Sequence, residues 1–144
     1  MRALALDVGD KTIGVALSDE LGITARGLFT LERVSEKKDT GKILDLVSEH
    51  NCGVVVVGLP INLNGTDSVQ TQKVRQFAAR LENKLRSNGK ADVSVTLHDE
   101  RFTTKIAEQV LIEADVSRKK RKEVIDKQAA VVILQSYLRA QALF

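Results

Sequence analysis

Short apolar runs separated by turn residues fill the first third of the chain and predict three consecutive strands. The stretch 3–18 reads as two apolar strands joined by a tight turn at Gly9-Asp10. A third strand is expected over 25–34, where the apolar positions give way to charged residues. Because the connections are short, these three strands should form an antiparallel meander.

After residue 34, helical and strand patterns alternate. Four stretches carry apolar residues at helical spacing and are predicted helices, over about 36–50, from 67 or 68 to 86, from 103 or 104 to 113, and 122–142. The β-branched run Val54–Val57 predicts a central strand parallel to its neighbour, and the alternation over 93–97 predicts a fifth strand. This order predicts an α/β fold. A five-stranded mixed sheet, made of the antiparallel meander plus two parallel strands, should carry helices on both faces, with the fourth strand beside the first.

Length and composition narrow the class of protein. A chain of 144 residues, 43% hydrophobic and 28% charged, is expected to form a single domain over 1–144. The longest apolar run is too short to cross a bilayer and the first residues lack a signal pattern, so we expect a cytoplasmic protein without a membrane partner. The single cysteine, Cys52, excludes an internal disulfide framework and should be a buried small hydrophobe.

Positive charge is concentrated toward the carboxyl end. Residues 101–144 hold 9 Lys/Arg against 5 Asp/Glu, whereas the first hundred hold 13 against 14. The excess centres on a basic run that is either a solvated surface or a phosphate-binding patch: Arg118, Lys119, Lys120, Arg121 and Lys122. With four Phe, one Tyr and no Trp, base stacking is excluded as the main mode of recognition. A nucleic-acid partner would be recognised by its backbone and shape.

Acidic residues occur at three places where an apolar residue would be structurally favoured. Asp7 lies within the first strand, Asp99 and Glu100 close the fifth, and Asp126 lies on the inward stripe of the last helix. Active sites of such sheets lie at the carboxyl ends of the parallel strands, where these acids can converge and would repel one another without a cation. Asp99 and Glu100 should point to opposite faces, so only one can join Asp7, and the pattern does not decide which.

The carboxylates indicate which metal ions the site would bind and which reaction these ions would support. Carboxylates without a Cys or His cluster favour Mg²⁺ or Mn²⁺ over zinc. Two such ions can hold a phosphodiester, one activating water and the other stabilising the leaving oxygen. The residues therefore predict a metal-dependent phosphodiesterase with two ions. Lys11, Arg101 and Asn64 are candidate substrate-binding residues, although Lys11 could be only an exposed turn residue and Arg101 only a partner for Asp99.

Several short motifs occur in order along nearly the whole chain. They are Asp7-Val8-Gly9 with Lys11 and Ile13–Ala16, Gly58-Leu59-Pro60 with Asn64-Gly65, Asp99-Glu100-Arg101 with Thr103-Thr104, and Asp126 with Ala129-Ala130 and Ile133–Gln135. Together they resemble the bacterial YqgF/RuvX family. The resemblance implies a ribonuclease H-like fold, similar to that of Holliday-junction resolvases, and implies Asp7, Glu100 and Asp126 as the metal-binding, catalytic acids. It also implies trimming of the 5′ end of precursor 16S ribosomal RNA, with junction resolution as the older proposal.

Four functions follow from these observations. The leading one is an endonuclease on structured RNA that leaves a 3′-hydroxyl and a 5′-phosphate. The second is a resolvase of branched DNA, which would need a symmetric dimer, so both a monomer and a homodimer remain open. The third is an ATP-binding module, because Asp7-Val8-Gly9 and Gly14 are similar to the first phosphate loop of actin-type proteins. The fourth is a non-catalytic RNA-binding partner of a larger assembly.

Overall fold

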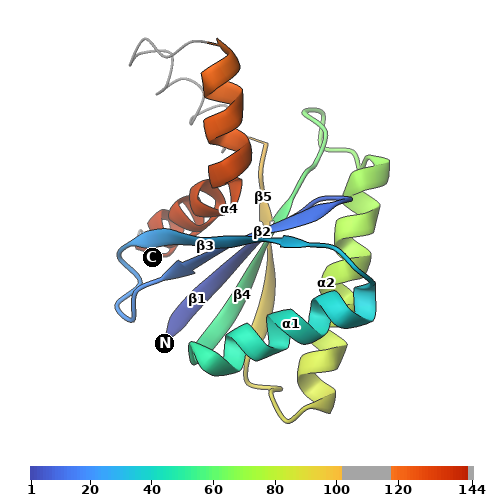
Figure 1. Ribbon diagram of the computed structural model, residues 1–144, viewed down its shortest axis with the longest axis vertical. Coiled ribbons are helices and arrows are strands. Elements are labelled where there is room, and N and C mark those ends of the chain that lie inside the picture. The colour runs from blue at the N-terminus through green and yellow to red at the C-terminus, as the bar shows by residue number, and fades with distance from the viewer. Residues whose placement is uncertain (102–117, 143–144) are drawn as a thin grey trace.

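The protein is built around one mixed sheet, seen in the computed structural model in Figure 1. The structure describes the backbone of residues 1–101 and 118–142 and the side chains of residues 1–101 and 128–142. The strands are β1 (Arg2–Val8), β2 (Thr12–Ser18), β3 (Ala25–Glu32), β4 (Cys52–Leu59) and β5 (Ser94–Asp99). The helices are α1 (Glu36–Glu49), α2 (Val69–Ser87) and α4 (Arg118–Ala142). The helix predicted over 103–113 lies outside the described residues.

The strand order confirms the predicted topology. It is β3-β2-β1-β4-β5, with β1, β2 and β3 paired antiparallel and β4 parallel to both β1 and β5. The turn between β1 and β2 closes through a hydrogen bond from the Gly9 amide to the Thr12 carbonyl, 2.9 Å. The connection from β3 to β4 places the fourth strand beside the first, as the sequence predicts.

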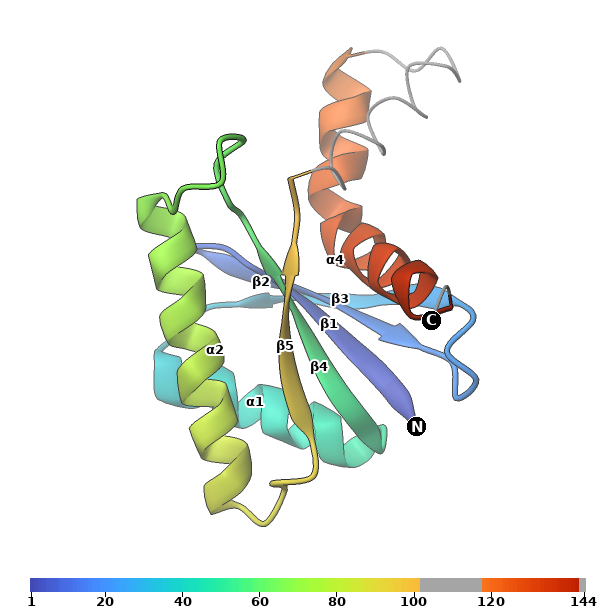
Figure 2. The same cartoon turned by 180° about the vertical axis from the view of Figure 1, so that it is seen from behind.

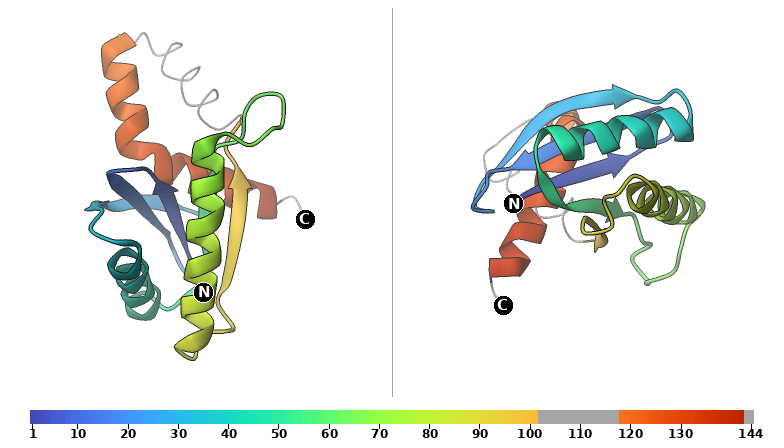
Figure 3. Two further views of the ribbon diagram at one scale, coloured as in Figure 1. Left: turned by 90° about the vertical axis from the view of Figure 1, so that its right-hand side faces the viewer. Right: turned by 90° about the horizontal axis from the view of Figure 1, so that it is seen from below.

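Helices cover both faces of the sheet, as Figure 3 shows. On one face, α1 and α2 bury large side chains against the strands, including Phe77 and Leu81 of α2. On the other face, α4 packs Ala130, Ile133 and Leu134 against small strand residues, Ala3, Ala5, Ala16 and Val56. Alanines on both sides let this helix approach the sheet closely.

Local signals explain where the helices begin. Ser35 caps α1, its hydroxyl accepting a hydrogen bond from the Lys38 amide at 3.2 Å, and Ser68 caps α2 in a reciprocal box with Thr71. The start predicted for the last helix at residue 122 is wrong, because α4 already begins at Arg118. Long unbranched Lys and Arg side chains favour helical backbone, so the basic run forms the first turns of α4.

Two predictions from composition can be compared with the structure. Cys52 is 2% exposed, and burial raises the pKa of its thiol to about 11, so it behaves as a small hydrophobe. Among the helices that the structure describes, none is long and apolar enough to cross a membrane.

The strands separate at their carboxyl ends. Pairing between β1 and β4 runs up to Leu6 and Val57, whereas β4 and β5 stay paired as far as Leu59 and Asp99. The amide of Glu100 then donates a hydrogen bond to the Leu59 carbonyl, 3.1 Å. The strand order reverses between β1 and β4, and ligand sites of such sheets form beyond the carboxyl ends of the strands at this point. A ligand site is therefore expected where β1 and β4 separate.

At Gly58, an added Cβ would force two neighbouring side chains to move. A Cβ built there would lie 2.5 Å from Ile133 Cδ1 and 2.8 Å from Glu100 Cδ. Gly58→Ala should therefore lower the free energy of unfolding by about 1–3 kcal/mol, the usual penalty for overpacking, in urea titrations. Gly41→Ala is the matched control, because a Cβ inside α1 meets only Lys84 Nζ at 3.5 Å, and it should raise stability by about 0.5–1 kcal/mol. Equal effects of the two substitutions would contradict this interpretation.

Candidate active site

Asp7 lies on the sheet face that α4 covers. It follows Ala3 and Ala5 at period two, and both alanines belong to the core beneath α4. Its antiparallel partner across the hairpin is Gly14, where an added Cβ would be 3.6 Å from both Asp7 Cβ and Ala130 Cβ. The half-buried Asp7 side chain is thus held in a narrow space between the two strands and the helix.

Glu100 reaches the same face from β5. Its carboxyl carbon lies over Gly58 and shares that space with the end of Ile133 from α4. Burial, and after it the negative charges of Asp7 and Asp99, together raise the pKa of Glu100 to about 7. The structure therefore brings Asp7 and Glu100 close enough for their charges to oppose one another.

Asp99 has a different environment. Arg101 donates from Nε at 2.8 Å and Nη2 at 2.7 Å to Asp99 Oδ2, and its backbone amide donates to Oδ1 at 2.9 Å. These hydrogen bonds hold the pKa of Asp99 below its usual value. Asp99 is therefore ion-paired with Arg101, whereas among the described side chains no cation forms an ion pair with Glu100.

The predicted substrate-binding residues lie around this edge. Arg101 holds Asp99, and a Cβ built on Gly65 would lie 3.6 Å from Arg101 Nη1, so the loop after β4 lies against the guanidinium. Lys11 is exposed at the turn after β1. Asn64 is exposed too, but its Oδ1 accepts hydrogen bonds from Thr66 N at 3.1 Å and Thr66 Oγ1 at 2.6 Å, so it shapes its own loop.

For Asp126 the structure describes the backbone alone, which lies in α4. Asp126 precedes Ala130 by four residues, about one helical turn, and Ala130 is the residue that approaches Gly14 beside Asp7. Its side chain lies outside the described residues, as do those of the basic run Arg118, Lys119, Lys120 and Arg121. Figures 1 and 2 place the first turns of α4 beyond the carboxyl ends of β4 and β5.

The residues present fit a hard divalent cation. Two carboxylates that repel each other at a half-buried place are the environment in which bound Mg²⁺ or Mn²⁺ offsets the cost of keeping both ionised. Asp7 and Glu100 could supply oxygen ligands to such an ion, and so could Asp126 from its position on α4. Within the described residues, no cluster of three metal-ligating side chains occurs.

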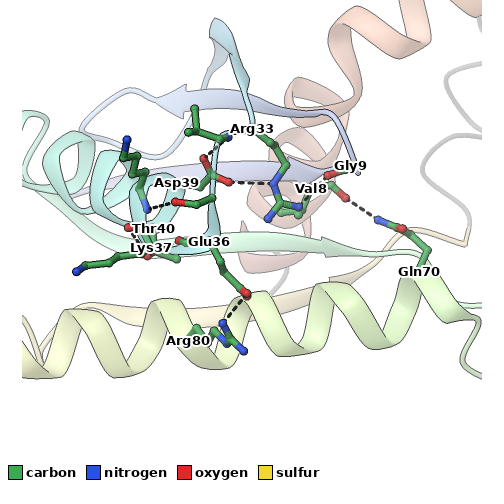
Figure 4. Close-up of polar contacts among 12 residues, drawn as sticks. Val8, Gly9, Arg33, Glu36, Lys37, Asp39, Thr40, Gln70 and Arg80 are labelled. Carbon is green, nitrogen blue, oxygen red and sulfur yellow. Dashed lines mark hydrogen bonds and ion pairs between the residues drawn. The ribbon is translucent and has the colours of Figure 1, made fainter.

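Three polar residues near Asp7 were missed by sequence reasoning. Arg33, Asp39 and Gln70 hold the backbone after β1 from the α1–α2 side of the sheet, as Figure 4 shows. Asp39 offered a signal, because it lies four residues before Ile43 on the apolar stripe of its helix. Arg33 and Gln70 offered none, since one ends a strand and the other begins a helix.

The fold is similar to that of solved resolvase structures. RuvC from Thermus thermophilus in complex with a Holliday-junction substrate aligns over 99% of this chain and 96% of that chain, with a TM-score of 0.65 and 14% identity. The yeast mitochondrial Holliday junction resolvase Ydc2 aligns over 97% of this chain and 78% of that chain, with a TM-score of 0.53 and 12% identity. These likenesses confirm the ribonuclease H-like fold.

Relatives at the sequence level cover the whole chain. A protein of Thermoanaerobacter pseudethanolicus is 52% identical over 142 residues, 98% of each chain, and one of Bacillus mycoides is 51% identical over 140 residues, 96% of this chain and 98% of the relative. Both carry the name "Putative pre-16S rRNA nuclease". The family model described as "RuvX: Holliday junction resolvase" matches residues 1–140. By this match and these identities, the chain belongs to the RuvX family.

Proposed function

We propose that this protein is a metal-dependent endonuclease that hydrolyses phosphodiester bonds in structured RNA, with the 5′ end of precursor 16S ribosomal RNA as its substrate. The observation that carries the proposal is the pair Asp7 and Glu100, two opposed carboxylates at the carboxyl ends of parallel strands. The nuclease names of the relatives and the resolvase description of the family support the reaction class.

The proposed roles follow from the position of each residue. Asp7, Glu100 and Asp126 would hold Mg²⁺ or Mn²⁺, which supplies an activated water and charge stabilisation when bound. Asp7 and Glu100 belong to strands of one sheet, so their separation is set by the register of that sheet. Gly58 and Ile133 pack against Glu100 and exclude water from one side of it, which strengthens its attraction to a cation.

Substrate phosphates would lie along the same edge. In this proposal, Lys11, Arg101 and Asn64 would contact phosphates near the two acids, and the basic run Arg118, Lys119, Lys120 and Arg121 in the first turns of α4 would add further phosphate contacts. Arg101 can bind a phosphate only with the part of its guanidinium that Asp99 leaves available. Contacts of this kind bind the nucleic-acid backbone and give affinity without reading sequence.

Resolution of branched DNA is the second candidate, because the family description and the fold likeness to RuvC both favour it. The deciding experiment incubates the protein with a precursor 16S ribosomal RNA transcript and with a four-way DNA junction, with and without Mg²⁺. Cleavage of the RNA alone supports the proposal. Symmetric cleavage of the junction by a dimer, measured with solution mass, supports the resolvase. RNA binding without cleavage in any metal would contradict both.

Asp7→Asn should remove cleavage without unfolding the protein. The substitution removes a proposed metal ligand and relieves repulsion with Glu100, so we expect a cleavage rate at least about 100-fold lower and an unchanged or raised thermal midpoint. Asp10→Asn is the control, because Asp10 lies two residues past β1 in an exposed pair with Lys73. Normal turnover of Asp7→Asn at saturating Mg²⁺ would refute the proposal.

Glu100 should make the stability of the metal-free protein depend on pH. Below its usual pKa of 4.5, Glu100 is protonated in both the folded and unfolded chain and carries no penalty. Between pH 4.5 and about 7 the unfolded chain loses this proton first, so the folded state loses stability, and above pH 7 the full penalty remains. In EDTA, Glu100→Gln should match wild type near pH 4.5 and exceed its free energy of unfolding by on the order of 2 kcal/mol above pH 7.

The neighbouring acid provides the control for this titration. Asp99→Asn removes an ion-pair partner of Arg101, and this loss should offset the relief of the charge that Asp99 places near Glu100, so the variant should not gain stability above pH 7 in the same urea titrations. Added Mg²⁺ should stabilise wild type more than Glu100→Gln above pH 7. A Glu100→Gln curve parallel to wild type throughout would contradict the assigned environment of Glu100.

Replacing Arg118, Lys119, Lys120 and Arg121 with serine should flatten the salt dependence of RNA binding. Each lost phosphate contact lowers the slope of log affinity against log salt by about 0.7–0.9. Binding is measured by filter retention in EDTA, which blocks cleavage. The control replaces Lys37, Lys38 and Lys42 of α1, on the opposite face of the sheet, and should change the slope less per charge removed. Equal slopes per charge would show that the basic run is only a solvated surface.

A further inference from the structure

The backbone that follows Asp7 is held by side chains from outside the hairpin. Gln70 Nε2 donates to the Val8 carbonyl at 3.1 Å, and Arg33 Nη1 donates to the Gly9 carbonyl at 2.9 Å. Figure 4 shows both bonds reaching these carbonyls from different elements, α2 and the segment after β3. We call Arg33 and Gln70 the loop clamp.

The next two residues of the turn are also contacted. The backbone amide of Arg33 donates to the Lys11 carbonyl at 2.9 Å, and Lys73 Nζ lies 3.2 Å from Asp10 Oδ1. The pair with Asp10 is exposed and contributes little, whereas the bonds of the loop clamp are part-buried. Val8 and Gly9 are thus tied to the α1–α2 side of the sheet and Lys11 continues the pairing between β2 and β3, while the Asp7 carboxylate lies on the α4 side.

Arg33 is itself fixed by a buried partner. Its Nε lies 3.1 Å from Asp39 Oδ2, and Asp39 Oδ1 accepts a hydrogen bond from the Val34 amide at 3.1 Å. Asp39 is 0% exposed, and the Arg33 guanidinium carbon lies 5.3 Å from the ring centre of Phe77. A planar guanidinium bound on two edges and stacked on a ring has little freedom, so its Nη1 is directed at Gly9.

The sheet holds this segment only on the side of β2, where Val8 pairs with Ile13. Pairing of β1 with β4 reaches Leu6, two residues before Val8. A carbonyl at a strand end that has no ladder partner needs another donor when it is removed from water, and the Gln70 amide is that donor for Val8. The loop clamp therefore replaces strand pairing at the point where β1 and β4 separate.

We propose that Arg33 and Gln70 are positioning residues for the metal site. Resting on the proposed function, this inference assigns to the loop clamp the task of holding the end of β1 so that Asp7 faces Glu100 at a fixed separation. Metal ligands that lose an orienting contact in their surroundings lose roughly 10- to 100-fold in metal affinity, because the ligand must then be ordered by the ion itself. The same clamp sets the direction of Lys11, which follows in the turn.

The test compares two substitutions on one helix. Gln70→Met keeps the length of the side chain and removes the donor to Val8. Gln72→Met makes the same change at an exposed residue of α2 whose Nε2 donates to Asp67 Oδ2 at 2.7 Å. Calorimetry with Mn²⁺ alone should show an affinity about 10-fold weaker for Gln70→Met and unchanged for Gln72→Met, and the Mg²⁺ midpoint of RNA cleavage should shift likewise. Gln70→Met leaves the part-buried Val8 carbonyl without this donor, so it should lower the free energy of unfolding in urea by about 1 kcal/mol and stay folded, whereas Gln72→Met should unfold close to wild type.

A second variant and a metal-free measurement complete the test. Arg33→Lys keeps the charge that Asp39 needs but loses the second donor edge, so it should also weaken Mn²⁺ binding. Hydrogen exchange of the Gly9 amide, which bonds Thr12, should quicken in Gln70→Met and Arg33→Lys but not in Gln72→Met. Wild-type Mn²⁺ affinity in Gln70→Met would overturn the positioning role alone, whereas a wild-type protein that neither binds Mn²⁺ nor cleaves would overturn the proposed function together with it.

Discussion

Repulsion between two carboxylates is the constraint on which this structure depends. Glu100 is held partly out of water beside Asp7, and burial with neighbouring negative charge raises its pKa to about 7. An arrangement of this kind lowers the stability of the free protein, so it persists only because the strands on either side specify it. The sheet register, the glycine beneath Glu100 and the ties on the end of β1 all act to keep the two acids together.

The small residues under α4 leave room for Asp7 and Glu100 beside the helix. Ala130 approaches Gly14 across from Asp7, and Ile133 shares with Glu100 the space above Gly58. A helix that approaches this closely brings its own residues into the same edge of the sheet, and Asp126 lies one turn before Ala130. The close packing of α4 and the placement of Glu100 beside Asp7 therefore depend on the same small residues, glycine and alanine, at the contact between helix and sheet.

Residues on the opposite face of the sheet hold the turn after β1. There, large apolar side chains form the main core, and the buried pair of Arg33 and Asp39 connects that core to the turn after β1. A buried ion pair contributes little net stability, because desolvation offsets the attraction. Its contribution here is directional, since Asp39 holds one edge of the guanidinium while another donates to the Gly9 carbonyl.

The sequence by itself determined the strand order and the parallel and antiparallel pairing, because apolar periodicity and short connections leave few topologies open. Its motifs also resembled the RuvX family, which the family match confirms, and that resemblance implied Asp7, Glu100 and Asp126 as the metal-binding acids. The apolar pattern could not choose between Asp99 and Glu100, since alternation along a strand says only that they differ in face. The tertiary structure distinguished them: Arg101 neutralises Asp99, while Glu100 lies over Gly58 near Asp7. Only the fold could show this, and the ties from Arg33 and Gln70, because they join residues 24 and 62 positions apart, beyond the reach of any local pattern.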